Sequence, residues 1–202
     1  MATHAPKLIG VVLAGGQSTR MGKDKASLEL QGQSLLERAR ITLAAISCDD
    51  IILSGHLRCG WTGRNLEDQQ CGLGPVSGIT RVIRWAQDLY KAPTRLLFIP
   101  VDTPLLSESL LLHLIGQANG YDGSYVSRSP LPLTLNLNAR TLQQAELADL
   151  DMTSGSTWSI HRFIQPLCMN TVDHHSINVR DLTNVNSPAE WESLKNEIAS
   201  LS

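Results

Sequence analysis

The sequence predicts an α/β fold built around a mainly parallel sheet. Residues 7–13, 49–55 and 95–101 are apolar, strand-like stretches, and each is followed by a segment with the apolar spacing of a helix. Such alternation favours parallel strands joined by right-handed crossovers, which place helices on both faces of the sheet.

The first predicted strand reads KLIGVVL and is almost entirely apolar, as expected of a central strand covered on both faces. Residues 26–30 then predict a short strand, and Gln31 with Gly32 predicts a turn. A helix follows over residues 35–46, with Ser34 placed to cap it.

The middle of the chain continues this alternation. Residues 75–90 and 107–118 have helical spacing, and the strand-like residues 95–101 lie between them. Residues 56–74 are polar, rich in glycine and without a convincing period. Within them, Trp61 could either stack on a base or cover an edge of the core.

The last third of the chain is less regular. Residues 130–138 alternate apolar and polar side chains, while residues 138–150 and 154–164 predict helices. A terminal helix is predicted over residues 187–201, with Pro188 in its first turn. Because no repeat or linker interrupts the sequence, we expect residues 1–202 to form a single domain.

Composition limits the classes of partner. The chain has 202 residues and a net charge of −2, so it has no overall cationic field to hold nucleic acid or an acidic membrane. No apolar stretch approaches the ~20 residues of a membrane span, and residues 1–7 lack a signal-peptide core. We therefore expect a cytoplasmic protein that binds a small molecule. The four cysteines lack CxxC spacing and are expected to be buried or idle thiols.

A glycine-rich, basic segment directly follows the first strand. Gly15, Gly16 and Gly22 allow positive φ and close backbone approach, and Arg20 and Lys25 add full positive charges. This composition predicts a cradle for phosphate groups. It matches neither GxxxxGK[ST] nor GxGxxG, the two common glycine motifs.

Asp102 ends the strand over residues 95–101, just before Thr103 and Pro104. Ligands of open parallel sheets bind outside the carboxyl ends of the strands, so Asp102 is expected near the glycine-rich segment. A carboxylate there is suited to Mg²⁺, although it could equally cap the following helix or turn.

Four motifs together resemble the molybdenum cofactor guanylyltransferases. Residues 13–28, LAGGQSTRMGKDKASL, resemble the pattern LAGGxSxRMGxDKxxL, and residues 74–78 resemble GPLAG. Residues 100–104 resemble the metal-aspartate strand end of that family, and residues 184–188 its NxNTP stretch. The motifs occur in family order across nearly the whole chain. The resemblance implies a Rossmann-like, three-layer α/β/α sandwich of the nucleotide-diphospho-sugar transferase type.

The resemblance also implies roles for individual residues. Arg20 and Lys25 would contact the triphosphate and, with Asp102 holding Mg²⁺, would carry catalysis. The residues implied to contact the nucleotide are Leu13, Ala14, Gly15, Gly16, Lys25, Asp68, Gly74, Gly78 and Asp102.

On the acceptor side, the resemblance implies that Asn184 and Asn186 lie by the pterin and near the metal. Family members often carry basic residues where Ser156 and Thr157 are neutral here. Arg162, about one turn later, is the candidate to replace them.

The implied reaction transfers GMP from GTP to the terminal phosphate of molybdopterin, giving molybdopterin guanine dinucleotide and pyrophosphate. Residues 1–118 would mainly bind the nucleotide and residues 119–202 mainly the acceptor. Other molybdenum cofactor biosynthesis proteins and molybdoenzyme chaperones are implied partners. The alternatives are CTP with molybdopterin, a nucleoside triphosphate with a sugar phosphate, and a GTP-binding regulator without catalysis.

Overall fold

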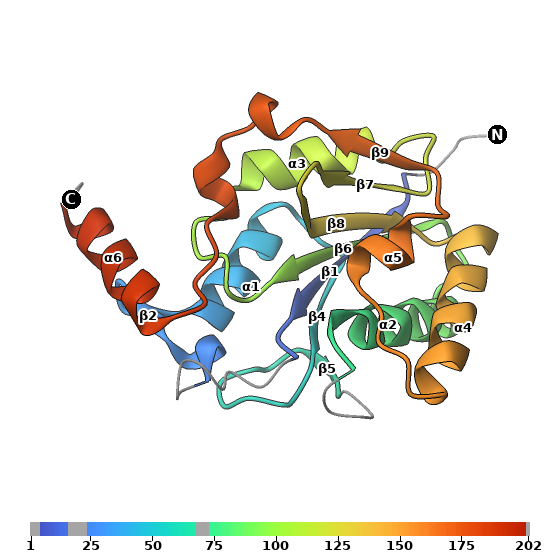
Figure 1. Cartoon of the computed structure of the whole chain (residues 1–202), viewed down its shortest axis with the longest axis horizontal. Coiled ribbons are helices and arrows are strands. Elements are labelled where there is room, and N and C mark those ends of the chain that lie inside the picture. Colours follow the sequence, from blue (N-terminus) through green and yellow to red (C-terminus); the bar gives the residue numbers. More distant parts are fainter. Residues whose placement is uncertain (1–4, 16–23, 68–72, 201–202) are drawn as a thin grey trace.

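The computed structural model describes residues 5–15, 24–67 and 73–200. A seven-stranded sheet runs through the middle of this part of the molecule (Figure 1). Its strands are β1 (Lys7–Leu13), β4 (Asp50–Ser54), β5 (Arg64–Leu66), β6 (Thr94–Pro100), β7 (Gly123–Val126), β8 (Ser129–Asn136) and β9 (Met169–Val172). They lie side by side in the order β5, β4, β1, β6, β8, β7, β9.

The sheet is mixed but mostly parallel, as predicted. Parallel pairing joins β1 to β4 and β6, β4 to β5, and β7 to β9, whereas β8 runs antiparallel to β6 and β7. In register, Val12 of β1 lies opposite Leu53 of β4 and Ile99 of β6. Because β8 is reversed, its amino end lies at the edge where β1 and β6 have their carboxyl ends.

Helices cover both faces of the sheet, which gives three layers (Figure 1). One face packs against α2 (Pro75–Leu89), α4 (Ala139–Thr153) and α5 (Ile160–Ile164). The other packs against α1 (Leu35–Ala45) and α3 (Glu108–Gln117). Helix α6 (Pro188–Ala199) adds Trp191 and Leu194 to the same hydrophobic cluster but lies farther from the sheet than α1 (Figure 1). None of the helices in the described ranges is long and apolar enough to cross a membrane.

Strand β1 shows how the sequence produces this layering. Ile9 and Val11 belong to the core beneath α2, whereas Val12 belongs to the core beneath α1 and α3. Gly10 also faces α1, and a Cβ there would lie 2.9 Å from Sγ of Cys48 and 3.0 Å from Leu43. The glycine therefore lets α1 approach the sheet closely.

Local signals define several element ends. The Ser34 hydroxyl accepts a hydrogen bond from the Glu37 amide at 3.1 Å, which confirms the predicted cap of α1.

Trp61 is buried and donates its Nε1–H to the Arg64 carbonyl at 3.0 Å. It covers an edge of the core, which decides between its two predicted roles.

Three segments differ from the sequence predictions or were not assigned by them. The strand expected over residues 26–30 is shorter than predicted: a 3₁₀ helix, Lys25–Ser27, precedes the strand β2 (Glu29–Leu30), which pairs with β3 (Gln33–Ser34). The segment over residues 56–74 contains β5, whose short, polar sequence has no period to detect. The helix expected over residues 154–164 starts only at Ile160. Gly155, with φ of 90°, lies just after the end of α4, and Ser156 and Trp158 bond to Asp151 before the helix begins.

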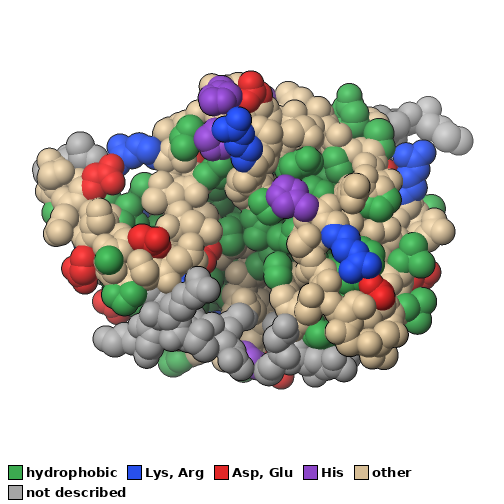
Figure 2. All heavy atoms as spheres, viewed as in Figure 1, with side chains coloured by type: hydrophobic (Ala, Val, Ile, Leu, Met, Phe, Trp, Pro, Cys, Tyr) green, Lys and Arg blue, Asp and Glu red, His purple; other side chains and the backbone are tan. Residues whose placement is uncertain are grey.

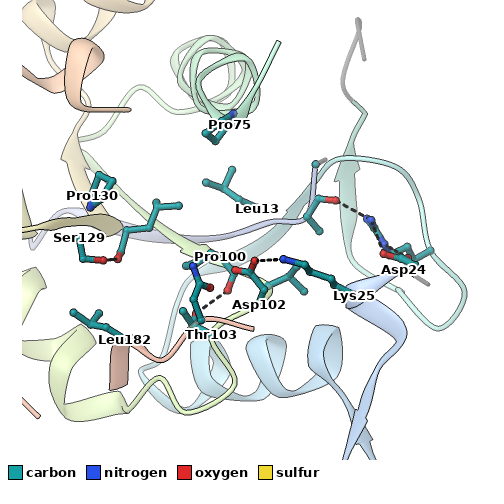
Figure 3. Close-up of a pocket in the computed structure, with 16 residues that line it drawn as sticks. Leu13, Asp24, Lys25, Pro75, Pro100, Asp102, Thr103, Ser129, Pro130 and Leu182 are labelled. Atoms are coloured by element: carbon teal, nitrogen blue, oxygen red, sulfur yellow. Dashed lines mark hydrogen bonds and ion pairs between the residues drawn. The ribbon is translucent and has the colours of Figure 1, made fainter. Parts of the chain in front are cut away.

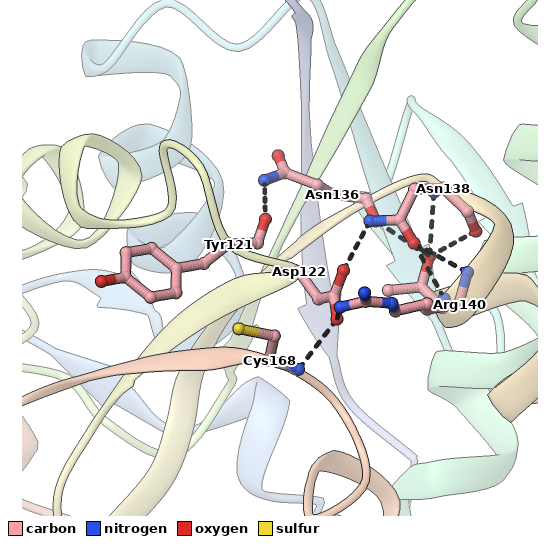
Figure 4. Close-up of polar contacts among 7 residues, drawn as sticks. Tyr121, Asp122, Asn136, Asn138, Arg140 and Cys168 are labelled. Atoms are coloured by element: carbon pink, nitrogen blue, oxygen red, sulfur yellow. Dashed lines mark hydrogen bonds and ion pairs between the residues drawn. The ribbon is translucent and has the colours of Figure 1, made fainter.

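A buried carboxylate ties three elements together at the end of the sheet opposite the cavity described below (Figure 4). Asp122, just before β7, accepts hydrogen bonds from Asn138 Nδ2 at 2.9 Å and from the Cys168 amide at 2.8 Å. Arg140 lies 3.4 Å from the same carboxylate. Asp122 thus joins the start of β7, the cap of α4 and the chain leading into β9.

Candidate active site

A cavity of about 360 Å³ opens where β1 and β6 end. Leu13, Ala14 and Gly15 continue β1 into it, and Pro100, Val101 and Asp102 continue β6. Figure 2 shows a hollow at the centre of one face of the molecule, with hydrophobic side chains inside it. The two predicted segments therefore meet at one edge of the sheet, as expected for parallel strands.

Lys25 and Asp102 form an ion pair in this cavity (Figure 3). The Lys25 ammonium nitrogen lies 2.9 Å from Oδ2 of Asp102 and 2.7 Å from Oδ1 of Asn186. Both charged side chains are largely covered, with 16% and 19% of their surface exposed. The structure thus brings together three predicted site residues from distant parts of the sequence.

Asn184 holds the other side of the Asp102 carboxylate. In the amide orientation that matches donors with acceptors, its nitrogen donates to Oδ1 of Asp102 at 2.7 Å and to the Asp102 carbonyl at 3.0 Å. The Val185 amide donates to that same carbonyl at 3.0 Å. The asparagine segment before α6 therefore contacts the aspartate directly, and both asparagines lie beside the proposed metal ligand.

Arg58 also lines the cavity, and sequence reasoning did not find it. Its guanidinium lies 2.6 Å from Oδ2 of Asp24 and 2.8 Å from the Ala14 carbonyl. Burial by itself would raise the pKa of Asp24, but the hydrogen bond and charge of Arg58, together with the Ala26 amide and the charge of His56, outweigh burial and lower the pKa below its usual value. Arg58 lies in the aperiodic segment over residues 56–74, where no motif marks it.

The opposite wall of the cavity is formed by prolines and apolar side chains. Pro75 begins α2, and Ser129, Pro130 and Leu131 begin β8. Gly74 caps α2 with φ of 80°, a conformation that favours glycine. Gly78 lies one turn into α2 and is buried. The predicted contacts of both glycines with a base stay predictions.

Arg162 is engaged outside this cavity. Its guanidinium lies 2.9 Å from Oδ2 of Asp151 and 4.1 Å from the centre of the Trp158 ring. The Asp151 carboxylate also accepts from Trp158 Nε1 at 2.7 Å and from Ser156, and these bonds with the charge of Arg162 lower its pKa. Arg162 therefore organises the segment before α5, and its role toward an acceptor stays a prediction.

Three predicted site residues, Gly16, Arg20 and Asp68, lie outside the described residues. Within the described ranges, no group of three or more histidine, cysteine, aspartate or glutamate side chains could hold a metal ion. The oxygen atoms of Asp102 and Asn186 are the ligand type that Mg²⁺ prefers, and they already face a cation in Lys25. Together they would suit Mg²⁺, with phosphate oxygens and water as its other ligands.

Known proteins resemble this chain over most of its length. Residues 10–170 match the family described as the MobA-like NTP transferase domain. The molybdenum cofactor guanylyltransferase of Xanthomonas euvesicatoria pv. vesicatoria is 34% identical over 188 residues, covering 93% of this chain and 94% of that protein. The protein of the same name from Shewanella frigidimarina is 26% identical, covering 96% and 99%.

Solved structures share the fold. Molybdopterin-guanine dinucleotide biosynthesis protein A from Archaeoglobus fulgidus superimposes with a TM-score of 0.76 at 19% identity, covering 96% of this chain and all of that one. The 2-C-methyl-D-erythritol 4-phosphate cytidylyltransferase of Thermus thermophilus gives 0.64 at 15% identity, covering 94% and 98%. The predicted Rossmann-like fold is confirmed. This chain therefore belongs to the MobA-like NTP transferase family and is a nucleotidyltransferase.

Proposed function

We propose that this enzyme transfers GMP from GTP to the terminal phosphate of molybdopterin. The observation that carries the proposal is the cluster of Lys25, Asp102, Asn184 and Asn186 at one end of the cavity. The names of the relatives from Xanthomonas and Shewanella support the choice of guanylyl transfer and of the molybdenum cofactor as acceptor.

The reaction breaks one phosphoanhydride bond and forms another. An oxygen of the acceptor phosphate attacks the α-phosphorus of GTP, and the bond from that phosphorus to the bridging oxygen breaks to release pyrophosphate. The second pKa of a phosphate monoester is about 6, so the nucleophile is already ionised at pH 7 and needs no general base. Catalysis then rests on positioning and on charge neutralisation.

The residues of the cavity divide these tasks. Asp102, with the Asn186 oxygen nearby, would hold Mg²⁺, which neutralises phosphate charge when bound. The Lys25 ammonium would contact the triphosphate. Arg20, outside the described residues, is proposed to assist it.

The rest of the assignment follows the two halves of the chain. We propose that residues 1–118 mainly bind the nucleotide, through Leu13, Ala14, Gly15 and the start of α2. Residues 119–202 would mainly bind the acceptor. We also propose that the enzyme is cytoplasmic. Other biosynthesis proteins would deliver the cofactor to it, and molybdoenzyme chaperones would receive the product.

Pyrophosphate release by the purified protein tests the proposal. The reaction contains molybdopterin and Mg²⁺, with either GTP or CTP, and parallel reactions replace molybdopterin by a sugar phosphate or Mg²⁺ by a chelator. We expect release only with GTP, molybdopterin and Mg²⁺ together. Faster release with CTP, or release with the sugar phosphate, would overturn the substrate assignment. GTP binding without turnover would indicate a regulator.

A further inference from the structure

Arg58 reaches the cavity from the segment between β4 and β5. Its Nε donates to Oδ2 of Asp24 at 2.6 Å, and its Nη2 donates to Oδ1 of the same carboxylate at 3.2 Å. Nη2 also donates to the Ala14 carbonyl at 2.8 Å, and Nη1 donates to the His56 carbonyl at 3.0 Å. The Arg58 side chain is 13% exposed.

These contacts indicate that Arg58 acts on the protein more than on a ligand. A guanidinium has five N–H groups, and four of those of Arg58 are directed at protein oxygen atoms. The arginine therefore has little donor capacity left for phosphate. What it can do is fix the relative positions of Ala14 and Asp24.

Because Asp24 precedes Lys25 and caps its helix, fixing Asp24 also fixes Lys25. Asp24 caps the 3₁₀ helix Lys25–Ser27, accepting from the Ala26 amide at 3.2 Å through its side chain and from Ser27 through its backbone carbonyl. The cap sets the direction in which the chain leaves Asp24, and Lys25 is the first residue of that helix. Its ammonium group then meets Asp102.

The Ala14 carbonyl is the second fixed point. Ala14 lines the cavity directly after β1, and its amide donates to the Ser54 carbonyl at the end of β4 at 2.9 Å. One guanidinium thus bridges the end of β1 and the residue that precedes Lys25 (Figure 3).

We propose that Arg58 is a positioning residue for nucleotidyl transfer, because it ties Asp24 to the Ala14 carbonyl and so fixes Lys25 beside Asp102. The proposal rests on the proposed function for its activity measurement, but nucleotide binding tests it separately. A lysine cannot replace the planar fork that contacts both partners, so charge alone is not sufficient.

The first experiment compares Arg58→Ala, Arg58→Lys and the wild type by pyrophosphate release, varying GTP and molybdopterin in turn. A misplaced catalytic group commonly costs up to ~100-fold in rate, so we expect kcat/KM for GTP to fall about 10- to 100-fold in Arg58→Ala. The KM for molybdopterin should stay unchanged, Arg58→Lys should recover only part of the loss, and millimolar guanidinium ion should restore activity to Arg58→Ala.

Arg40→Ala is the matched control. Arg40 also makes two hydrogen bonds to one carboxylate, at 2.6 and 2.8 Å from Glu37, but on the surface of α1. It should behave like the wild type. Unchanged kcat/KM for GTP in Arg58→Ala would overturn the proposal, and so would an equal rise in KM for both substrates together with a lower melting temperature.

A double-mutant comparison tests the route through Asp24. Because Arg58 and Asp24 are expected to act as one unit, Arg58→Ala/Asp24→Asn should be within about threefold of the worse single variant. A double variant whose loss of kcat/KM equals the product of the two single losses would contradict the coupling.

Calorimetric titration with GTP and Mg²⁺ separates the two proposals. If the wild type binds GTP but transfers no GMP, the proposed function fails. In that case, a 10-fold or greater loss of GTP affinity in Arg58→Ala still supports the positioning role. Unchanged GTP affinity would then overturn it.

Discussion

The ammonium group of Lys25 lies 2.9 Å from Oδ2 of Asp102, although 77 residues separate the two in sequence. Lys25 begins a 3₁₀ helix beyond β1, and Asp102 follows β6, the strand paired with β1. The opposite charges cancel within the cavity before any ligand arrives. Binding of a metal ion and a triphosphate would therefore rearrange an existing pair, and substitution of either partner gives a direct test.

Lys25→Met keeps much of the side-chain length and removes the charge. Loss of a group that stabilises transition-state charge typically costs 10²- to 10³-fold in kcat, and we expect about that loss in pyrophosphate release. Lys195→Met is the control, because Lys195 pairs with Glu192 on the exposed surface of α6. Near-normal kcat in Lys25→Met would contradict the role of the ammonium group.

Asp102→Asn keeps the shape of the side chain but removes its charge. We expect turnover to fall at least ~100-fold and the Mg²⁺ concentration for half-maximal rate to rise, because a neutral amide is a poorer metal ligand. A Mg²⁺ titration of pyrophosphate release measures both effects. Asp88→Asn, on the exposed side of α2, should leave the titration unchanged. An unaltered Mg²⁺ dependence in Asp102→Asn would show that the metal binds elsewhere.

Two glycine substitutions should change stability in opposite directions. A Cβ at Gly123 would lie 2.0 Å from the Thr134 carbonyl of β8, a backbone atom that cannot rotate away. Gly123→Ala should therefore lower the free energy of unfolding by roughly 3 kcal/mol or more. Gly116, within α3, meets nothing within 4 Å, so Gly116→Ala should raise it by about 0.5–1 kcal/mol. Urea denaturation measures the free energy of unfolding of both variants. Equal changes in Gly123→Ala and Gly116→Ala would contradict the close packing of β7 on β8.

The described cysteines should differ in their reaction with iodoacetamide. Burial, with the neighbouring charge of Asp49, raises the pKa of Cys48 to about 12, so only ~10⁻⁴ of it is thiolate at pH 8. Cys59 and Cys168 are exposed. Mass spectrometry of labelled peptides should find Cys59 and Cys168 modified well before Cys48, whose labelling should require unfolding. Rapid labelling of Cys48 in the folded protein would overturn this order.

The lowered pKa of Asp24 predicts a pH-dependent contribution to stability. A carboxyl whose pKa is depressed by folding stabilises the native state above its unfolded pKa, about 3.8, and loses that contribution as pH falls through the folded value. The free energy of unfolding of the wild type minus that of Asp24→Asn should therefore be constant above about pH 5 and shrink below pH 4. Because Asp24 is 43% exposed, we expect its pH-dependent contribution to the free energy of unfolding to be less than about 1 kcal/mol. A difference that grew in acid would contradict the pairing with Arg58.

Strong local signals made much of this fold predictable. The strand over residues 7–13 occupies the bounds predicted from its apolar run, and α2 ends one residue before the predicted 90. Strand β5 was missed because an edge strand of three residues needs little burial and leaves no pattern. The start of α5 was misplaced because side-chain bonds to Asp151 compete with helix formation before Ile160.

The site was predictable to the extent that motifs marked its residues. Lys25, Asp102, Asn184 and Asn186 lie in such motifs and meet in the structure. Arg58 could not be found in this way, because its function depends on a contact 34 residues away with Asp24 and on a backbone carbonyl that carries no sequence signal.

Pro75, Pro100 and Pro130 come from three different elements and line the same cavity. Each proline ring fixes its own φ, so these parts of the wall sample few backbone conformations even without a ligand. Ordering of flexible groups is one of the main costs of binding. The walls therefore lose little conformational entropy when a ligand binds, and a larger share of the contact energy is left to hold the nucleotide and the acceptor in line.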